Sequence, residues 1–162
     1  MENWHLPSIL LLAAWFSVLR AARYSGWRIA LLSLVGTTGH ELCHAAVGWV
    51  LGAKPTSFSL LPRREGNVWV LGSVGFRNLT LWNAAPVAFA PLLLAGLAWL
   101  IFQFWTVPAF EAEAYVAWLL SGYVLATCLF SCMPSWTDLK IGGLSGLLYG
   151  GLGYVGWQLA TG

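Results

Sequence analysis

The segment GTTGHELCHAAVGW, residues 36–49, places two histidines and a glutamate inside an otherwise apolar stretch. His40 and His44 are four residues apart, so a helix would stack them on one face, where both imidazoles can reach a single ion. Glu41 would stand beside them. Two imidazole nitrogens, one further protein ligand and an open position for water are typical of a catalytic Zn²⁺ site.

The chemistry of such a site gives each residue type a role. A bound divalent ion lowers the pKa of its water toward 7, and a neighbouring carboxylate can accept the proton as the water attacks a carbonyl. Glu41 is therefore the predicted general base, and His40 and His44 are the predicted metal ligands. The alternative needs no catalysis: the same groups could be hydrogen-bonded polar residues of a helix bundle, or part of a proton or ion path.

A metal site of this kind needs a third protein ligand, and the chain offers few. Asp138 follows a proline and opens the last apolar segment, at membrane depth, so it is the predicted third ligand; its alternative role is a helix N-cap. Cys43 is rotated by about 100° from His44 on a helix and is more typical of a small buried residue. Apart from Glu41 and Asp138, the acidic residues are Glu2, Glu65, Glu111 and Glu113.

The composition is that of a membrane protein. Of the 162 residues, 59% are hydrophobic and only 9% are charged, which is outside the balance of a soluble domain. The net charge of +2 is spread over several loops and gives no basic stripe, so nucleic-acid binding is not expected. The length predicts a single membrane-embedded domain over residues 1–162. The cysteine pair Cys128 and Cys132, at helical spacing, is expected to pack rather than to form a disulfide.

The apolar segments predict an all-α integral membrane protein with five transmembrane helices. A spanning helix needs roughly 20 mostly apolar residues. Arg20 and Arg23 cut the first segment short, so four spans with an interfacial helix are the alternative. Gly36 and Gly39, beside the histidine motif, permit close approach of another backbone. The five candidate segments are residues 7–24, 29–51, 84–105, 114–133 and 141–159.

Between Lys54 and Trp82 the pattern changes from helix to strand. Two β-branched and aromatic runs flank a Gly66-Asn67 turn signal, which predicts a membrane-associated β-hairpin at about residues 57–75. Its unpaired strand edge must be covered by protein or by a ligand. The distribution of Lys and Arg favours a cytoplasmic hairpin by five residues to three. The lack of an organelle-targeting signal favours a prokaryotic plasma membrane.

The histidine motif, the hairpin and two later segments follow one another along the chain in an order that resembles the site-2 protease family of intramembrane zinc metallopeptidases. The resemblance implies that His40, His44 and Asp138 bind Zn²⁺ and that Glu41 is the general base. It also implies that an extended segment of a membrane-protein substrate pairs with the edge of the hairpin. The four features are HELCH in an apolar helix (40–44), the hairpin that follows it, NAAPVAFAPLLLA (83–95) and SCMPSWTDLKIGG (131–143).

The chain also departs from the family pattern. Ser131 stands where the family usually has Asn, and Ala85 where it usually has Gly. Asp138 is followed by Leu-Lys rather than by Gly, and it lies one residue closer to the preceding proline. The expected function is hydrolysis of a peptide bond within or next to the bilayer. The alternative is a non-proteolytic metal-binding scaffold or an ion or proton carrier that uses the same cluster.

Overall fold

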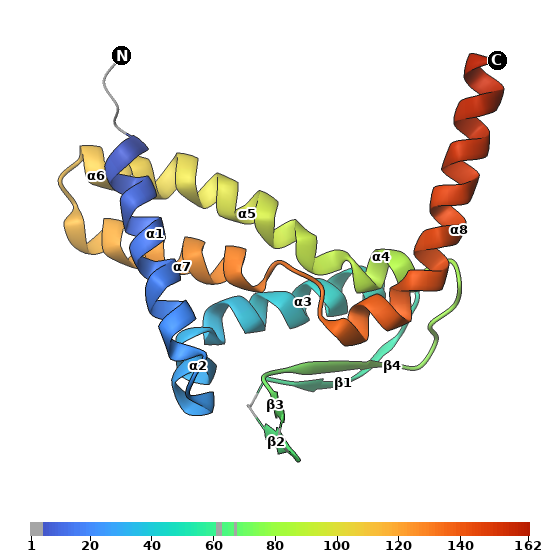
Figure 1. Cartoon of the computed structure of the whole chain (residues 1–162), viewed down its shortest axis with the longest axis horizontal. Helices are drawn as coiled ribbons and strands as arrows, with labels where there is room; N and C mark the ends of the chain where they lie inside the picture. Colours follow the sequence, from blue (N-terminus) through green and yellow to red (C-terminus); the bar gives the residue numbers. More distant parts are fainter. Residues whose placement is uncertain (1–4, 61–62, 67) are drawn as a thin grey trace.

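The computed structural model describes residues 5–60, 63–66 and 68–162, which form a mostly helical molecule with one small β-hairpin (Figure 1). The strands are β1 (Pro55–Ser59), β2 (Arg63–Glu65), β3 (Val68–Val70) and β4 (Ser73–Phe76). The helical elements are α1 (His5–Ala22), α2 (Gly26–Leu32), α3 (Leu34–Val50), α4 (Ala84–Ala88), the 3₁₀ turn η1 (Ala90–Leu92), α5 (Leu93–Ile101), the π-helical turn η2 (Phe102–Thr106), α6 (Val107–Glu111), α7 (Tyr115–Ser131) and α8 (Trp136–Thr161).

Helix α7 lies at the centre of the helical body and packs against α1, α3 and α5. Its residues Leu125 and Cys128, with Cys132 just after it, form a buried core with Leu94 and Ala98 of α5. The prediction that the cysteine pair is a packing element is confirmed. Helix α8 differs: its first part packs against α4, whereas residues 147–162 are exposed and extend away from the other elements (Figure 1).

The helix predicted over residues 29–51 is divided into α2 and α3 at Ser33. The hydroxyl of Ser33 donates a 2.6 Å hydrogen bond to the carbonyl of Ile29, and a serine bonded to the preceding turn often bends a helix. The remaining helix α3 has 17 residues, which corresponds to about 25 Å. It is therefore shorter than the roughly 20 residues that a transmembrane helix needs.

Within the described residues there are fewer candidate membrane spans than predicted. Two helical stretches, His5–Ala22 and Ala90–Glu111, are long and apolar enough to cross a membrane, and a third exists if α7 and α8, bent by 57° at their junction, are one span. The prediction of five spans is wrong, and so is the alternative of four. The junction contains Pro134, which lacks the backbone N–H that a continuous helix needs, so two predicted spans become one bent pair.

The predicted β-hairpin is confirmed. β1 pairs with β4 and β2 pairs with β3, both antiparallel, so that the strands form one hairpin in two short ladders, of which the β1–β4 ladder lies beside α3. Glu65 pairs with Val68, and Gly66 between them has a φ of +61°, a conformation that tight hairpin turns require. Asn67, the second residue of the predicted turn signal, lies outside the described residues.

Candidate metal centre

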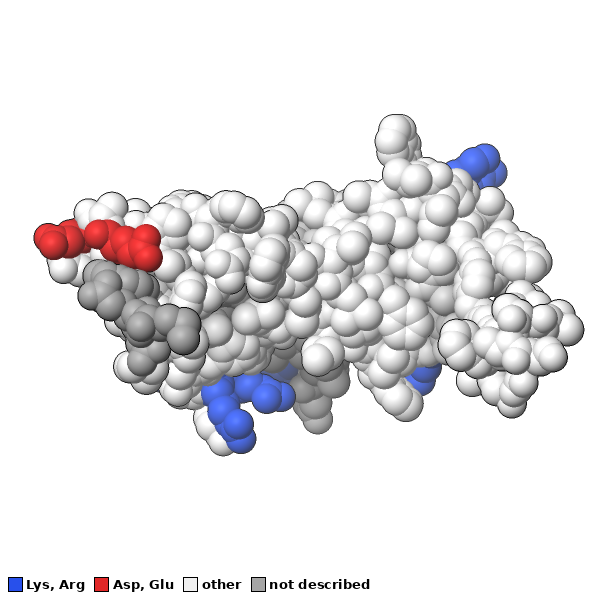
Figure 2. Space-filling model, turned by 90° about the horizontal axis from the view of Figure 1, so that it is seen from above, with Lys and Arg blue, Asp and Glu red and all other residues white. Residues whose placement is uncertain are grey.

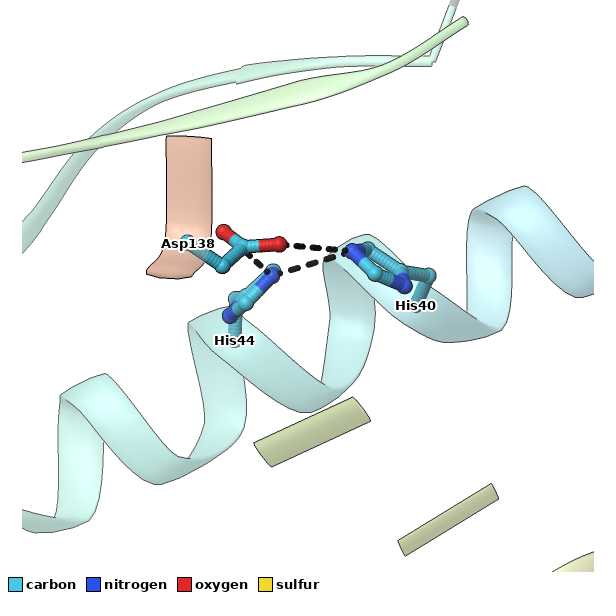
Figure 3. Close-up of side chains that lie close together, drawn as sticks. All are labelled: His40, His44 and Asp138. Atoms are coloured by element: carbon cyan, nitrogen blue, oxygen red, sulfur yellow. Dashed lines mark hydrogen bonds and ion pairs between the residues drawn. The ribbon is translucent and has the colours of Figure 1, made fainter. Parts of the chain in front are cut away.

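The side chains of His40 and His44 point from α3 toward Asp138 in the first turn of α8 (Figure 3). The two Nε2 atoms are 3.1 Å apart. Oδ1 of Asp138 lies 3.2 Å from His44 Nε2, and Oδ2 lies 3.4 Å from His40 Nε2. The three side chains are only 12%, 6% and 13% exposed, in the order His40, His44 and Asp138. Together they form a group that could hold a metal ion.

Backbone carbonyls determine which nitrogen of each histidine faces this centre. Nδ1 of His40 lies 2.7 Å from the carbonyl oxygen of Ser131, and Nδ1 of His44 lies 2.7 Å from that of Val87. A carbonyl only accepts hydrogen bonds, so each Nδ1 carries a proton and donates it. In the neutral imidazole, Nε2 then presents a lone pair to the centre, which is the tautomer that a metal ligand needs.

The geometry fits a divalent metal ion. Two lone pairs and a carboxylate that face one another at 3.1–3.4 Å repel unless a cation or a proton lies among them. An ion bound tetrahedrally at about 2.0–2.1 Å, the usual Zn²⁺–nitrogen distance, separates its ligand atoms by about 3.3–3.4 Å. The observed separations are close to this value. Two imidazoles with one carboxylate are also a common donor set for such ions.

Asp138 is held in place by the N-terminal capping box of α8. Ser135 is the N-cap: its Oγ accepts the backbone N–H of Asp138 at 3.2 Å, and Oδ2 of Asp138 accepts the backbone N–H of Ser135 at 2.6 Å. The Asp138 carboxylate therefore both faces the two histidines and takes part in the helix cap, although the N-cap residue itself is Ser135. The spacing Ser-x-x-Asp before an apolar run is the signal in the sequence that could have shown this.

Gly36 brings α3 and α7 together next to His40. A methyl group at residue 36 would collide with the backbone carbonyl of Thr127 and would lie 2.6 Å from Oγ of Ser131. This close approach places the Ser131 carbonyl, at the end of α7, beside the imidazole of His40. Gly39 faces Leu94 of α5 instead, so only one of the two glycines lies against another backbone.

The candidate metal centre opens into a cleft of about 640 Å³. Ser33 and the face of α3 that carries His40 and His44 line one side, and hairpin residues 69–74 together with Phe76 line another side. The strands of the hairpin pass over the three side chains in Figure 3. The centre is therefore enclosed by helices on one side and covered by the hairpin on the other.

Glu41 lines the same cleft but does not belong to the ligand group. It is 7% exposed and lies against Gly72, in the connection between β3 and β4. The hydrogen bonds and ion pairs described at the centre join the two histidines and Asp138, and they leave the Glu41 carboxylate out. Cys43 packs against the core of α5 and α7. The structure thus brings Glu41 and the three predicted ligands to one cleft and directs Cys43 elsewhere.

Comparison of the chain with protein-family models, with curated proteins and with solved structures finds no match.

Proposed function

We propose that the chain is an intramembrane zinc metallopeptidase, similar to the site-2 protease family, that hydrolyses a peptide bond of a membrane-protein substrate. The proposal is carried by the convergence of His40, His44 and Asp138 within 3.1–3.4 Å, beside Glu41 in one cleft. Three protein ligands that face an open cleft are typical of catalytic zinc, whereas structural zinc sites have four.

The chemistry follows from the positions of the side chains. Zn²⁺ bound by His40, His44 and Asp138 would supply a Lewis acid and a water of lowered pKa. Glu41 accepts the proton of the attacking water at a carboxylate oxygen and delivers it to the leaving nitrogen. The carbonyls of Ser131 and Val87 hold the two imidazoles in the orientation that ligation needs.

The shape of the cleft supports an extended peptide as the substrate. Ser33 and His44 are eleven residues apart along the helical segment, a distance of about 16 Å, which is the length of about five residues of a β-strand. Residues of β4 line the facing side, and an added strand would pair with a free hairpin edge. Apolar residues such as Val74, Phe76 and Ile141 line the cleft, so an apolar substrate segment fits it best.

The charge distribution supports an orientation with the hairpin at the cytoplasmic face of the membrane, which we take to be a prokaryotic plasma membrane as the sequence predicts. Figure 2 shows acidic side chains gathered at the end of the molecule where α6 leads into α7. Basic residues flank the hairpin instead: Lys54 precedes β1, Arg77 follows β4, and Lys140 lies in the first part of α8. An excess of Lys and Arg marks the cytoplasmic side of membrane proteins.

The test compares purified wild type with Glu41→Gln. Bound zinc is measured by elemental analysis, and cleavage of a mixture of synthetic apolar transmembrane-type peptides in detergent is measured by mass spectrometry. We expect equal zinc in both proteins and a loss of cleavage of about 10²- to 10⁴-fold in the variant, the usual contribution of a general base. Glu113→Gln, in the loop after α6, is the matched control and should behave like wild type.

Three outcomes contradict the proposal. Wild type without bound zinc, or full cleavage by Glu41→Gln, rules out this mechanism. Bound metal without cleavage by the wild-type protein favours the alternative, a metal-binding scaffold or an ion or proton carrier that uses the same cluster.

A further inference from the structure

The hairpin is held over the cleft by an aromatic contact at each end. The indole of Trp69 occupies the space that a side chain at Gly26 would fill, and it makes an edge-on contact with Trp27, with 5.3 Å between the ring centroids. The ring of Phe76 occupies the corresponding space at Gly48 of α3. Both rings fit because the glycines have no Cβ. The hairpin segment between them is thereby fixed across the cleft.

Gly72 lies between these two rings along the chain, and it contacts Glu41. A methyl group at residue 72 would lie 2.7 Å from Cγ and 2.9 Å from Oε1 of Glu41, well inside the ordinary carbon–carbon contact distance of about 3.5–4.0 Å. The φ of Gly72 lies outside the left-handed region, so its backbone conformation is open to alanine. Glycine is needed at this position for space, not for backbone freedom.

We propose that Gly72 is a positioning residue for Glu41. Its missing side chain leaves the space that the Glu41 side chain occupies beneath the hairpin, and its backbone confines the carboxylate to the cleft that the metal ligands share. This role rests on the proposed function, in which Glu41 is the general base. A side chain at residue 72 displaces that base while His40, His44 and Asp138 stay in place, because none of the three is among the atoms nearest to the added methyl group.

The first experiment separates positioning from metal binding. Gly72→Ala is compared with Gly143→Ala in α8, where an added methyl group meets no atom within 4 Å. We expect both variants to keep wild-type zinc content. We expect Gly72→Ala to lower kcat about 10- to 100-fold, because a misplacement of about 1 Å can have an effect of about 100-fold, and to leave KM for the same peptide mixture unchanged. Wild-type kcat in Gly72→Ala overturns the positioning role.

The second experiment tests the contact without using activity. Unfolding temperatures in detergent are measured for wild type, Gly72→Ala, Glu41→Ala and the double variant. If Gly72 and Glu41 share the space, the alanine at 72 lowers the unfolding temperature of the wild-type protein and has a smaller effect when Glu41 is already truncated. Equal effects in both backgrounds overturn the proposal. If the two substitutions are coupled in unfolding temperature but the wild-type protein cleaves no peptide, the contact between Gly72 and Glu41 is confirmed and the proposed function is contradicted.

Discussion

The backbone N–H of Ser135 donates a 2.6 Å hydrogen bond to Oδ2 of Asp138, the oxygen that lies 3.4 Å from Nε2 of His40. The residue that caps α8 and the residue that completes the candidate metal centre are therefore joined through one carboxylate. The start of α8 consequently sets the position of Asp138 relative to the histidines of α3. This hydrogen bond links the stability of a helix end to the geometry of the candidate metal centre.

Ser135→Ala is expected to weaken metal binding without removing any ligand. The variant loses the hydroxyl that accepts the backbone N–H of Asp138, and loss of a cap destabilises a helix start by about 1 kcal/mol. The backbone N–H that holds the carboxylate remains, so the effect acts through the weakened helix start, and we expect metal affinity to fall about 5-fold, the equivalent of about 1 kcal/mol. Zinc affinity is measured by competition with a chelating dye. Ser17→Ala, an exposed serine in α1, is the control, and an affinity equal to that of wild type in both variants would contradict the coupling.

The fold could be predicted where it depends on the sequence of apolar and turn residues. The membrane helices and the hairpin follow from apolar runs and from the turn signal at Gly66. The break between α7 and α8 is predicted, because a proline separates the apolar segments 114–133 and 141–159. The bend at Ser33 could not be predicted in this way, because it depends on the Ser33 hydroxyl bonding to Ile29. Hydropathy counts apolar residues and does not contain that interaction.

The site could be predicted where a residue type has distinctive chemistry. The spacing of His40 and His44 places them on one helix face, and the shortage of acids in an apolar chain indicated Asp138. The carbonyls of Ser131 and Val87, which orient the two imidazoles, could not be predicted, because every residue has a carbonyl and only tertiary packing selects these two. The same holds for the position of Gly72 against Glu41.

Replacement of a histidine of the centre should abolish metal binding, whereas replacement of the third histidine should not. His44→Ala removes a ligand that is hydrogen-bonded and almost completely shielded, so we expect the metal content to fall from about one ion per chain to near zero. His5→Ala, at the exposed start of α1, should keep the wild-type content. Elemental analysis of the purified proteins decides the matter. Metal retained in His44→Ala would show that the ion binds elsewhere.

Gly36→Ala should disturb both the packing of α3 on α7 and the metal centre. The added methyl group collides with the carbonyl of Thr127, which belongs to helix backbone and cannot move alone, so we expect a destabilisation of about 1–3 kcal/mol, as for other overpacked sites. The Ser131 carbonyl would then move away from His40, and metal affinity would fall. Gly96→Ala, where the methyl group meets nothing within 4 Å, should be neutral or slightly stabilising. Equal unfolding temperatures for the two variants would contradict the close approach.

Trp69→Ala should release one end of the hairpin and make the metal easier to extract. An aromatic pair such as Trp69 and Trp27 contributes about 0.5–1.5 kcal/mol beyond the area it buries. A change of about 1.4 kcal/mol corresponds to a tenfold change in an equilibrium constant. Loss of the pair therefore makes the state in which the hairpin has moved off the cleft about 2- to 10-fold more populated. The rate at which a soluble chelator removes the bound metal should rise by the same factor. Trp49→Ala, which truncates a tryptophan that is 78% exposed, should leave that rate unchanged. The covering role of the hairpin is wrong if the rates for both variants equal that of wild type.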